Sequence, residues 1–383
     1  MRAPLHVIQV SFFRDPEERS PSQLLHAWPS LVDVAEAAYA AGIRVTVVQA
    51  SSHSQGLERA GTHYHFLPFE EAGEGGGLAK LLAELEPDVV HVHGLGFARD
   101  VLSLAALAPG VPMILQDHAD RLPRLWRRGL WRRQMVVAAG VAFCAKAQAR
   151  PFVEAGLLPA HVPLYEIPES TSRFVPGEPR EACEPGGLGG NPAVLWVGHL
   201  NENKDPLTVL DGISAAARRL PELRLWCCFG TAPLLHDVRR RIARDASLRT
   251  RVRLLGRVAH ESIEQLMQAA DLFVLGSHQE GSGYSVIEAL ACGLPPIVTD
   301  IPSFRSLTGE GAVGALWPCG DSRALCEALA SARFDPPARA AVRAHFDREL
   351  SLGSLGRKLA AMYVDARERK QLPYRNASAM AGP

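Results

Sequence analysis

Short, largely apolar segments alternate with helical patterns along most of this chain, and this alternation limits the folds it can adopt. The segment from Ile43 to Gln49 is nearly continuously apolar, which is typical of a parallel strand buried on both faces. Such strands, separated by helices, predict a doubly wound α/β sheet. In the first part of the chain we expect strands at 6–12, 43–49, 64–68, 89–93, 113–116 and 140–144, and helices at 31–41 and 78–86.

A second series of the same kind follows a stretch rich in Pro, Gly and Glu between Ser170 and Pro192. Because 383 residues exceed what a single core usually fills, we predict two domains joined near residue 170. The glycines at 186, 187, 189 and 190 do not predict a dinucleotide site, since they precede a strand instead of following one. In this part we expect strands at 194–197, 223–229, 252–255, 272–275 and 296–299, and helices from 205, at 234–244, at 284–292 and at 355–369, with residues 372–383 frayed.

Charge, cysteine content and hydropathy narrow the class of protein. Lys and Arg together number 41 and are balanced by 41 Asp and Glu, so nothing favours a nucleic-acid partner. The seven cysteines include no C-x-x-C pair, which argues against a disulfide framework or a zinc site and indicates a reducing compartment. The longest apolar run, Met135 to Ala145, has 11 residues, whereas about 20 are needed to span a bilayer. We therefore expect a cytoplasmic protein without a transmembrane helix.

The loop after the expected strand 272–275 has the residues of an anion-binding site, and ligands of doubly wound sheets bind beyond the carboxyl ends of the strands. Gly281 and Gly283 let a ligand approach the backbone, and the free N–H groups of the following helix attract phosphate. Glu280 at the strand exit and Glu288, about one turn into the helix, could face the same ligand. A cap or a solvated glutamate would explain either carboxylate alone, but it explains the pair and both glycines poorly.

The loop after the expected strand 194–197 carries a lysine suited to a diphosphate. Asp205 and Pro206 form a good N-cap and first position for a helix. Lys204 lies just before that helix, where its charge can neutralise phosphate. The alternative is that Lys204 is only a surface lysine.

The segment from Glu280 to Glu288 resembles the E-x7-E motif of family 4 glycosyltransferases, which have the GT-B fold, and the likeness extends over residues 194–335. It implies that Glu280 binds the donor sugar and Glu288 the nucleotide ribose. In similar enzymes an arginine after the glycine joins the lysine on the phosphates, whereas here the position holds His199, which is mostly neutral at pH 7. The donor-binding residues that the resemblance implies are Gly198, His199, Gly281, Ser282, Gly283, Tyr284 and Glu288.

The resemblance is weaker in the first half of the chain. Val89 to Gly94 resembles the strand and glycine turn on the acceptor side, and His118 lies where the family often has a histidine near the reacting sugar. The implied catalytic residues are thus His118, Lys204 and Glu280. The resemblance further implies two Rossmann-like domains facing across a cleft: residues 1–170 on the acceptor side, with 355–383 packing back on them, and residues 171–354 on the nucleotide-sugar side.

Two local features of the first half stay open. A metal site at His91, His93 and His118 lacks a carboxylate or cysteine to complete it, and plain core or loop histidines are the alternative. Residues 167–174 resemble the family's linker strand, with Glu169 where asparagine is commoner. The family's glycine-rich first loop is replaced here by Phe12 to Asp15.

The activity that the resemblance implies is a retaining, metal-independent and cofactor-free transfer of a hexose from a nucleotide-diphosphate sugar. The acceptor would be a sugar, a lipid-linked molecule or a small molecule, as in the synthesis of cell-surface polysaccharide or glycolipid. A GT-B sugar epimerase or phosphorylase is a related alternative, although nothing marks a pyridoxal lysine. A non-catalytic two-domain ligand-binding protein is the alternative from another class, but it would not need the two glutamates.

The segment from Arg121 to Arg133 holds six arginines among leucines and tryptophans. This composition suits a charged acceptor or a peripheral contact with anionic lipid at the inner face of the membrane. A solvated helix with its apolar face on its own domain is the alternative.

Overall fold

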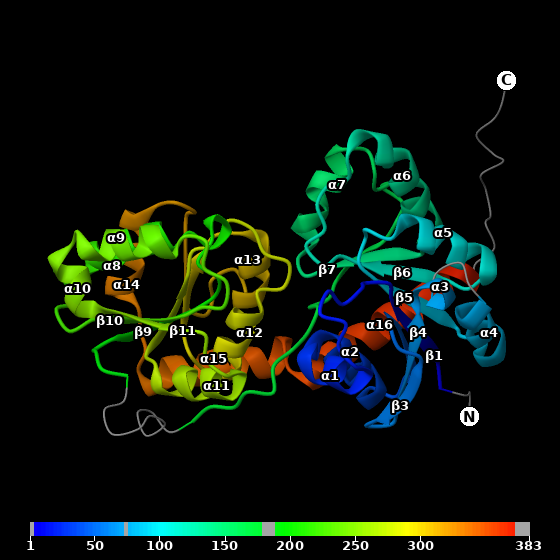
Figure 1. The fold of residues 1–383 in the computed structure, drawn as a ribbon, viewed down its shortest axis with the longest axis horizontal. Coiled ribbons are helices and arrows are strands. Elements are labelled where there is room, and N and C mark those ends of the chain that lie inside the picture. Colours follow the sequence, from blue (N-terminus) through cyan, green and yellow to red (C-terminus); the bar gives the residue numbers. More distant parts are fainter. Residues whose placement is uncertain (1–3, 73–75, 178–187, 372–383) are drawn as a thin grey trace. The chain divides into compact units, whose positions relative to one another are not determined.

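The computed structural model describes residues 4–72, 76–177 and 188–371, which belong to two compact units (Figure 1). Unit 1 comprises Met1–Ser170 and Leu352–Pro383, and unit 2 comprises Thr171–Ser351. In each unit a mostly parallel sheet carries helices on both faces. Each unit is therefore a doubly wound α/β domain.

The sheet of unit 1 is parallel except at one edge. Its strands are β1 (His6–Ser11), β2 (Arg44–Ser51), β3 (Gln55–Arg59), β4 (Thr62–Pro68), β5 (Val89–His93), β6 (Met113–Gln116), β7 (Gly140–Phe143) and β8 (Leu164–Glu166). Within the described residues these eight strands lie in the order β3-β4-β2-β1-β5-β6-β7-β8, and the β3–β4 pair is antiparallel. The chain builds outward from β1 on one side and then returns to place β5 on the other. The loops after β1 and β5 thus meet at a switch point, where doubly wound sheets bind ligands.

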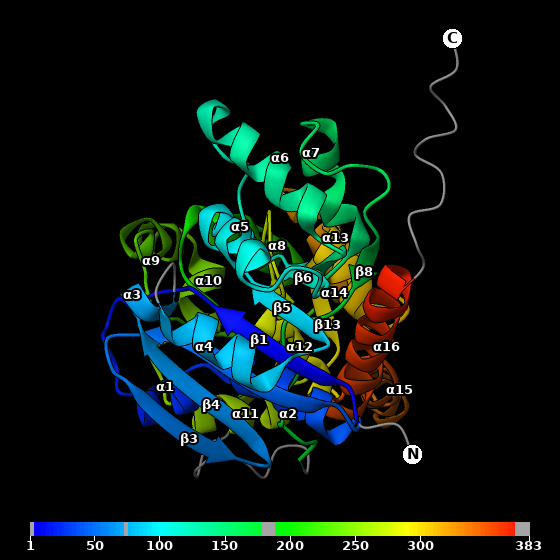
Figure 2. The same cartoon turned by 90° about the vertical axis from the view of Figure 1, so that its right-hand side faces the viewer.

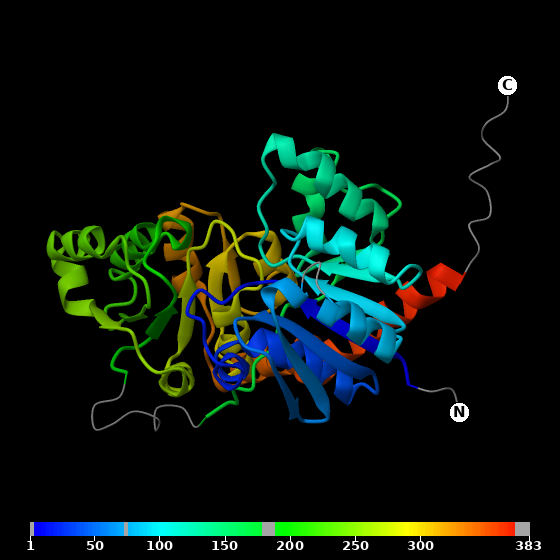
Figure 3. The same cartoon turned by 45° about the vertical axis from the view of Figure 1, so that its right-hand side comes forward.

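Helices cover both faces of this sheet, as Figures 2 and 3 show. They are α1 (Pro21–Ala27), α2 (Pro29–Ala40), α3 (Phe69–Ala72), α4 (Gly76–Leu85), α5 (Ala98–Leu107), α6 (Arg128–Val137), α7 (Arg150–Glu154) and α16 (Leu352–Gln371), with short 3-10 turns η1 (Leu125–Arg127) and η2 (Lys146–Ala149). Val7 of β1 packs with α1, α2 and α16, whereas the next residue, Ile8, packs with α4, α5 and α6. This alternation explains why β1 is apolar at successive positions. Helix α16 lies close to α2, since a Cβ at Gly356 would collide with the carbonyl oxygen of Ala37.

The sheet of unit 2 is parallel throughout. Its strands are β9 (Ala193–Val197), β10 (Arg224–Cys228), β11 (Val252–Gly256), β12 (Leu272–Leu275), β13 (Pro296–Thr299) and β14 (Ala315–Trp317). Its helices are α8 (Pro206–Ala216), α9 (Leu235–Ala243), α10 (Ala246–Arg251), α11 (His260–Ala269), α12 (Tyr284–Ala291), α13 (Pro302–Thr308), α14 (Ser322–Ser331) and α15 (Pro336–Glu349), with the 3-10 turn η3 (Glu202–Lys204). Among the described residues the strand order is β11-β10-β9-β12-β13-β14. The switch point therefore lies between β9 and β12.

Several expectations from the sequence need correction. The first sheet has eight strands in its described residues rather than six, because β3 is a polar, exposed edge strand and β8 has only three residues. In the second sheet, β14 was not expected and is equally short. Helix α16 begins at Leu352 instead of Leu355, since its first turn precedes the buried stripe by which the helix was recognised. The residues 352–354 accordingly belong to unit 1.

The expected linker strand is also absent from the described residues. Strand β8 ends at Glu166, and residues 167–174 have no sheet partner. Side chains bond this buried segment instead: the hydroxyl of Ser170 donates to Asp33 at 2.8 Å, and that of Thr171 donates to the carbonyl of Leu350 at 2.6 Å. Residues 178–187 of the expected Gly- and Pro-rich linker, including Cys183, and the terminus 372–383 lie outside the described residues.

Candidate active site

The switch point of unit 2 brings the two loops predicted to bind the donor side by side. Lys204 follows β9, Glu280 follows β12, and the ammonium group of Lys204 contacts a carboxylate oxygen of Glu280. Only 14% of the lysine side chain and 13% of the glutamate side chain are exposed. The pair is therefore largely withdrawn from water. Opposite charges attract each other more strongly in such surroundings than in water.

Asn203 joins these two loops. Its side-chain amide donates to the carbonyl of Gln279 at 2.9 Å, and its side-chain oxygen accepts from the N–H of Gln279 at 3.1 Å. Its own carbonyl accepts from the N–H of His278 at 2.8 Å. Gly276 allows the close approach, because a Cβ there would lie 3.0 Å from the carbonyl oxygen of Lys204. Hydrogen bonds therefore hold the two loops together, and this fixes the positions of Lys204 and Glu280.

The beginning of helix α8 holds Lys204 at the end of the β9 loop. As the sequence predicted, Asp205 caps the helix by accepting from the N–H of Thr208 at 3.2 Å, and Pro206 occupies its first position. Asp205 adopts a left-handed conformation with φ 46°. The N–H of Lys204 donates to the side chain of Asn201 at 3.0 Å. Backbone contacts therefore fix where the lysine side chain starts.

The beginning of helix α12 has the features of an anion cradle. Gly283 caps the helix at φ 65°, and a Cβ there would lie 2.8 Å from the ring of Phe304. Ser282 is 3% exposed, and its hydroxyl has no hydrogen-bond partner among the described residues. Gly281 is buried beside it, whereas Tyr284 is exposed at the first helical position. A buried hydroxyl and the free N–H groups of a helix start are together suited to phosphate oxygens.

Glu288 and His199 have partners that the sequence did not suggest. Glu288, in α12, accepts a hydrogen bond from Nε2 of His260 at 2.7 Å, and this bond raises the pKa of His260. His199, next to Gly198, accepts at Nδ1 from the N–H of Thr231 at 3.2 Å. A neutral ring that accepts at Nδ1 carries its hydrogen on Nε2, so His199 can still donate to a ligand.

Unit 1 contains a separate cavity of about 430 Å³ at its own switch point. Its wall is built from the loops after β1, β5 and β6 and from the start of α2. His118 and His93 line it from neighbouring strand ends. Gly94 makes the turn after β5 at φ 94°, where a Cβ would lie 2.8 Å from the ring of Phe97. The lining residues are Ser11, Phe13, Trp28, Ser30, Leu31, Gln49, His93, Gly94, Gly96, Phe97, His118 and Asp120.

His118 is held between a carboxylate and a second histidine. Its Nδ1 lies 3.0 Å from a carboxylate oxygen of Glu169, and its Nε2 lies 3.1 Å from Nδ1 of His93. Burial lowers the pKa of His118, but the hydrogen bond and charge of Glu169, with Asp120 and Asp117, outweigh burial and leave it raised. Burial lowers the pKa of His93 well below its usual value. The pKa values of the two histidines are therefore shifted in opposite directions, and His118 is the one that holds a proton more readily.

Two further titratable side chains, His91 and Asp117, lie near His118. Burial, together with the charge of His118, lowers the pKa of His91 to about 3, and its Nδ1 lies 2.8 Å from the hydroxyl of Tyr363 in α16. Burial and the charge of Asp120 raise the pKa of Asp117 to about 7. Within the described ranges, no group of three or more His, Cys, Asp or Glu side chains has the arrangement of a metal site. His93 and His118 instead lie within hydrogen-bonding distance of each other, and the rings of His91 and His93 pack with centroids 4.4 Å apart.

The structure thus brings some of the predicted residues together. Lys204 and Glu280 are in contact, whereas Glu288 bonds to His260, and His118 belongs to unit 1. Asn203 and His260 were missed. Asn203 directly precedes Lys204 in the loop that the sequence predicts to bind the donor, so its position in that loop could have indicated it. His260 lies 28 residues before Glu288, and no local pattern connects them.

Two family models match the chain, one in each unit. Residues 29–162 match Glycosyltransferase Family 4, and residues 191–333 match Glycosyl transferases group 1. The GDP-mannose:cellobiosyl-diphosphopolyprenol alpha-mannosyltransferase of Xanthomonas oryzae pv. oryzae is 29% identical over 237 residues. That match covers 60% of this chain and 60% of the relative's length.

Solved structures share the fold over nearly the whole chain. Sucrose-phosphate synthase from Thermosynechococcus elongatus superposes with a TM-score of 0.67 at 16% identity, covering 95% of this chain and 100% of that one. Anabaena Alr3699/HepE in complex with UDP gives a TM-score of 0.63 at 18% identity, covering 94% and 100%. At this identity the likeness shows the fold, which is GT-B with two Rossmann-like domains. No helix in the described part of the chain is long and apolar enough to cross a membrane.

Proposed function

The chain belongs to family 4 of the GT-B glycosyltransferases, and on that premise we propose that it transfers a sugar, with retention, from a nucleotide-diphosphate sugar to an acceptor hydroxyl. The contact between Lys204 and Glu280 at the switch point of unit 2 carries the proposal. It places a cation and a carboxylate side by side where a doubly wound sheet binds its ligand. Such a pair suits a donor that has a diphosphate on one side and sugar hydroxyls on the other. A non-catalytic binding protein would not need it.

Each residue at this site has a proposed role. The Lys204 ammonium group, the Ser282 hydroxyl and the N–H groups at the start of α12 bind the diphosphate and stabilise its charge as it leaves. Glu280 accepts hydrogen bonds from the sugar hydroxyls, and Glu288 accepts them from the ribose. His199 donates a hydrogen bond to the bound donor through Nε2. We further propose that no metal ion is needed, because the lysine and the helix start supply the positive charge.

The cavity of unit 1 that His93 and His118 line, which we call the histidine cavity, is the proposed acceptor site. A cavity of about 430 Å³ is large enough for a sugar-sized group. His118 lies in its wall, and its bond to Glu169 orients the ring. The hydroxyl that attacks the donor would bind next to this ring.

Nucleotide-sugar turnover tests the proposal. The full chain is incubated with UDP- and GDP-linked sugars, and the release of nucleotide diphosphate is followed. We expect release with at least one donor, and we expect Lys204→Ala and Glu280→Gln to reduce it strongly. Lys80→Ala is the matched control, because the 3.8 Å pair of Lys80 with Glu84 is exposed. Failure of every donor, or equal activity of Lys204→Ala and wild type, would contradict the assignment.

We also propose that the enzyme works in the cytoplasm at the inner face of the membrane, on an acceptor for cell-surface glycan or glycolipid synthesis. The name of the Xanthomonas relative includes a diphosphopolyprenol acceptor. Leu125 and Trp126, in η1 of this chain, are each 74% exposed within the arginine-rich segment 121–133. Exposed apolar side chains among arginines suit a surface of anionic lipid.

Liposome flotation tests this membrane contact. Vesicles with phosphatidylglycerol should carry the protein to the top of the gradient, and vesicles of phosphatidylcholine alone should not. Leu125→Ser/Trp126→Ser should lower the floated fraction. The proposed contact is contradicted if the protein does not float with either kind of vesicle, or if this variant floats as well as wild type.

A further inference from the structure

Unit 1 has a second cavity beside the histidine cavity, with a volume of about 540 Å³. Gly96 and Asp120 line both cavities, so the two share a wall. The other lining residues of the second cavity are Arg121, Leu122, Pro123, Arg124, Trp126, Arg127 and Trp131. We call it the arginine cavity.

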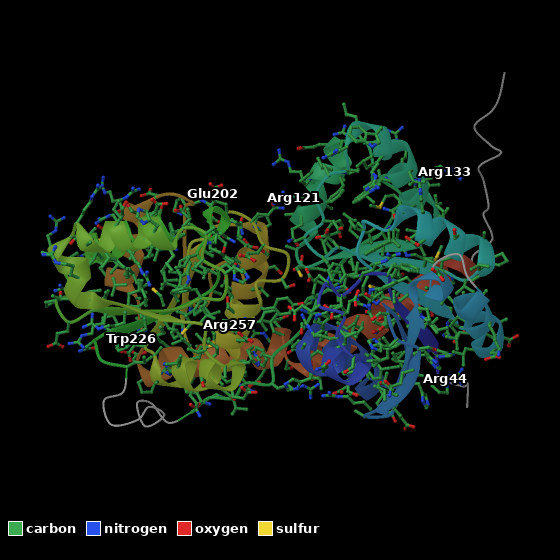
Figure 4. All side chains as sticks on the ribbon, viewed as in Figure 1. Arg44, Arg121, Arg133, Glu202, Trp226 and Arg257 are labelled. Atoms are coloured by element: carbon green, nitrogen blue, oxygen red, sulfur yellow. The ribbon has the colours of Figure 1, made fainter. Side chains whose placement is uncertain are left out.

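The three lining arginines lack acidic partners. In the described part of the chain, no carboxylate lies within ion-pair distance of Arg121, Arg124 or Arg127. Arg121, labelled in Figure 4, lies in the loop between β6 and α6. The guanidinium carbon of Arg124 lies 5.2 Å from the ring centroid of Trp126. Three positive charges thus line one cavity without an ion pair among the described residues, which favours an anionic ligand.

Asp120 is the acidic residue in the wall, and hydrogen bonds already occupy one of its oxygens. Its Oδ2 accepts from the N–H of Leu95 at 2.7 Å and from the N–H of His118 at 3.2 Å. These bonds partly compensate its charge. Asp120 therefore serves to connect the loops after β5 and β6, and the balance of charge in the cavity stays positive.

The floor of the arginine cavity is firmly packed. The ring of Trp131 is buried and stacks on Phe152, with centroids 6.1 Å apart and planes at 4°. The buried side chain of Gln134 donates to the carbonyl of Leu95 at 2.7 Å, which ties α6 to the wall that both cavities share. A site with a fixed floor loses little freedom when a ligand binds.

The rim of the arginine cavity is apolar and exposed. Leu125 and Trp126 are each 74% exposed, and Leu122 is 40% exposed. Apolar side chains next to arginines match a ligand that joins an anionic group to an apolar chain. A free phosphate or a free sugar would not use this rim.

We propose that the arginine cavity binds the phosphate or diphosphate group of the acceptor, with the acceptor's apolar chain on Leu125 and Trp126 and its hydroxyl next to His118. The shared wall at Gly96 and Asp120 places the two groups of one molecule in adjacent cavities. The inference rests on the proposed function, which makes the ligand an acceptor. It adds the anionic and apolar character of that acceptor and the residues that select it.

Calorimetric titration of the full chain with geranyl diphosphate tests this binding. All proteins carry Lys204→Ala, so that binding of the probe's diphosphate at the proposed donor site is weakened equally in each of them. Arg121→Ala/Arg127→Ala should weaken binding roughly 10-fold or more, because charge-assisted hydrogen bonds are lost. Arg99→Ala/Arg133→Ala removes two exposed arginines of the same unit that do not line the cavity, and should change the Kd less than about twofold. Arg121→Gln/Arg127→Gln should reproduce the weakening and guards against misfolding of the alanine variant.

Two further probes identify which part of the ligand binds. Inorganic pyrophosphate should bind more weakly than geranyl diphosphate and should also lose affinity in Arg121→Ala/Arg127→Ala. Geraniol, which has no charge, should bind weakly and equally to all variants. The proposal is overturned if geranyl diphosphate binds equally to the wild-type and variant cavities, if the control variant weakens binding as much, or if geraniol or pyrophosphate binds as tightly.

Hydrolysis of the donor separates this inference from the proposed function. With Lys204 intact and no acceptor present, the wild-type protein should release nucleotide diphosphate from its donor, because this reaction uses the loops of unit 2 and not the arginines of unit 1. Absence of release from the wild-type protein would contradict the proposed function, while the calorimetric result would still decide whether the arginine cavity binds the probe. Normal release with unchanged binding of geranyl diphosphate would contradict the cavity alone.

Discussion

Replacing Lys204 by alanine should weaken the binding of a nucleotide diphosphate for two separate reasons. The first is the loss of a charge-assisted hydrogen bond, worth about 1.5–3 kcal/mol, or roughly 10- to 150-fold in affinity. The second follows from the contact with Glu280. Without the ammonium group between them, the diphosphate and the Glu280 carboxylate repel each other.

The repulsion between the diphosphate and the Glu280 carboxylate can be calculated from the geometry of the Lys204–Glu280 pair. A phosphate oxygen that bonds to the Lys204 ammonium group lies about 3 Å from it, and the ammonium group contacts Glu280. The phosphate and the carboxylate are then about 6 Å apart, and at an effective dielectric constant of about 20 their repulsion is about 3 kcal/mol. Both side chains are less than one sixth exposed, so solvent screening is limited. Glu280→Gln in the Lys204→Ala background should therefore recover roughly 10- to 100-fold of the lost affinity.

Calorimetric titration of wild type, both single variants and the double variant with UDP and GDP measures this coupling. Lys80→Ala and Lys80→Ala/Glu84→Gln form the matched control cycle, and this exposed pair should show no coupling in nucleotide affinity. If the double variant binds no better than Lys204→Ala alone, the ion pair does not act on the donor site. Unchanged affinity in Lys204→Ala would remove the lysine from the site altogether.

Three further variants test the remaining roles. Glu280→Gln should lower kcat roughly 100-fold with the fold intact, and near-normal turnover would contradict its role at the donor sugar. Glu288→Ala should raise the donor KM roughly 10- to 150-fold and weaken discrimination against 2′-deoxyribose nucleotides; an unchanged KM would make it structural. Glu169→Gln should lower the pKa of His118, as followed by NMR of its ring. The raised pKa of His118 stabilises the folded state at pH below about 6.5, and this stabilisation is lost as the pH rises through the folded-state pKa. Glu169→Gln should therefore lose more stability at about pH 5.5 than at about pH 8.

Strands buried on both faces could be located from the sequence. The strands β5, β6, β12 and β13 begin and end at the residues expected from their apolar runs. Their signal is local, because each residue meets a helix on one face or the other. The edge strand β3 and the three-residue strands β8 and β14 carry no such signal, since their order depends on a neighbouring strand.

Candidate ligand-binding residues could be predicted where a loop follows a strongly patterned strand. Glu280 and Lys204 were predicted in this way, because the carboxyl end of a strand in a doubly wound sheet is where ligands bind. Their contact could not be foreseen from spacing, since 76 residues separate them. Glu288 illustrates the same limit: its position on α12 was expected, but its bond to His260 was not.

The sequence by itself determined the class of each domain and the loops that carry the candidate donor site, because hydrophobic periodicity and helix capping act between near neighbours. The tertiary structure alone decided which side chains meet. Lys204 contacts Glu280 because β12 lies next to β9 and not next to β11, its predecessor in the chain. His118 pairs with Glu169 because the buried segment after β8 returns to the strand ends of unit 1. These contacts follow from strand order and burial, which are properties of the whole domain and not of any short segment.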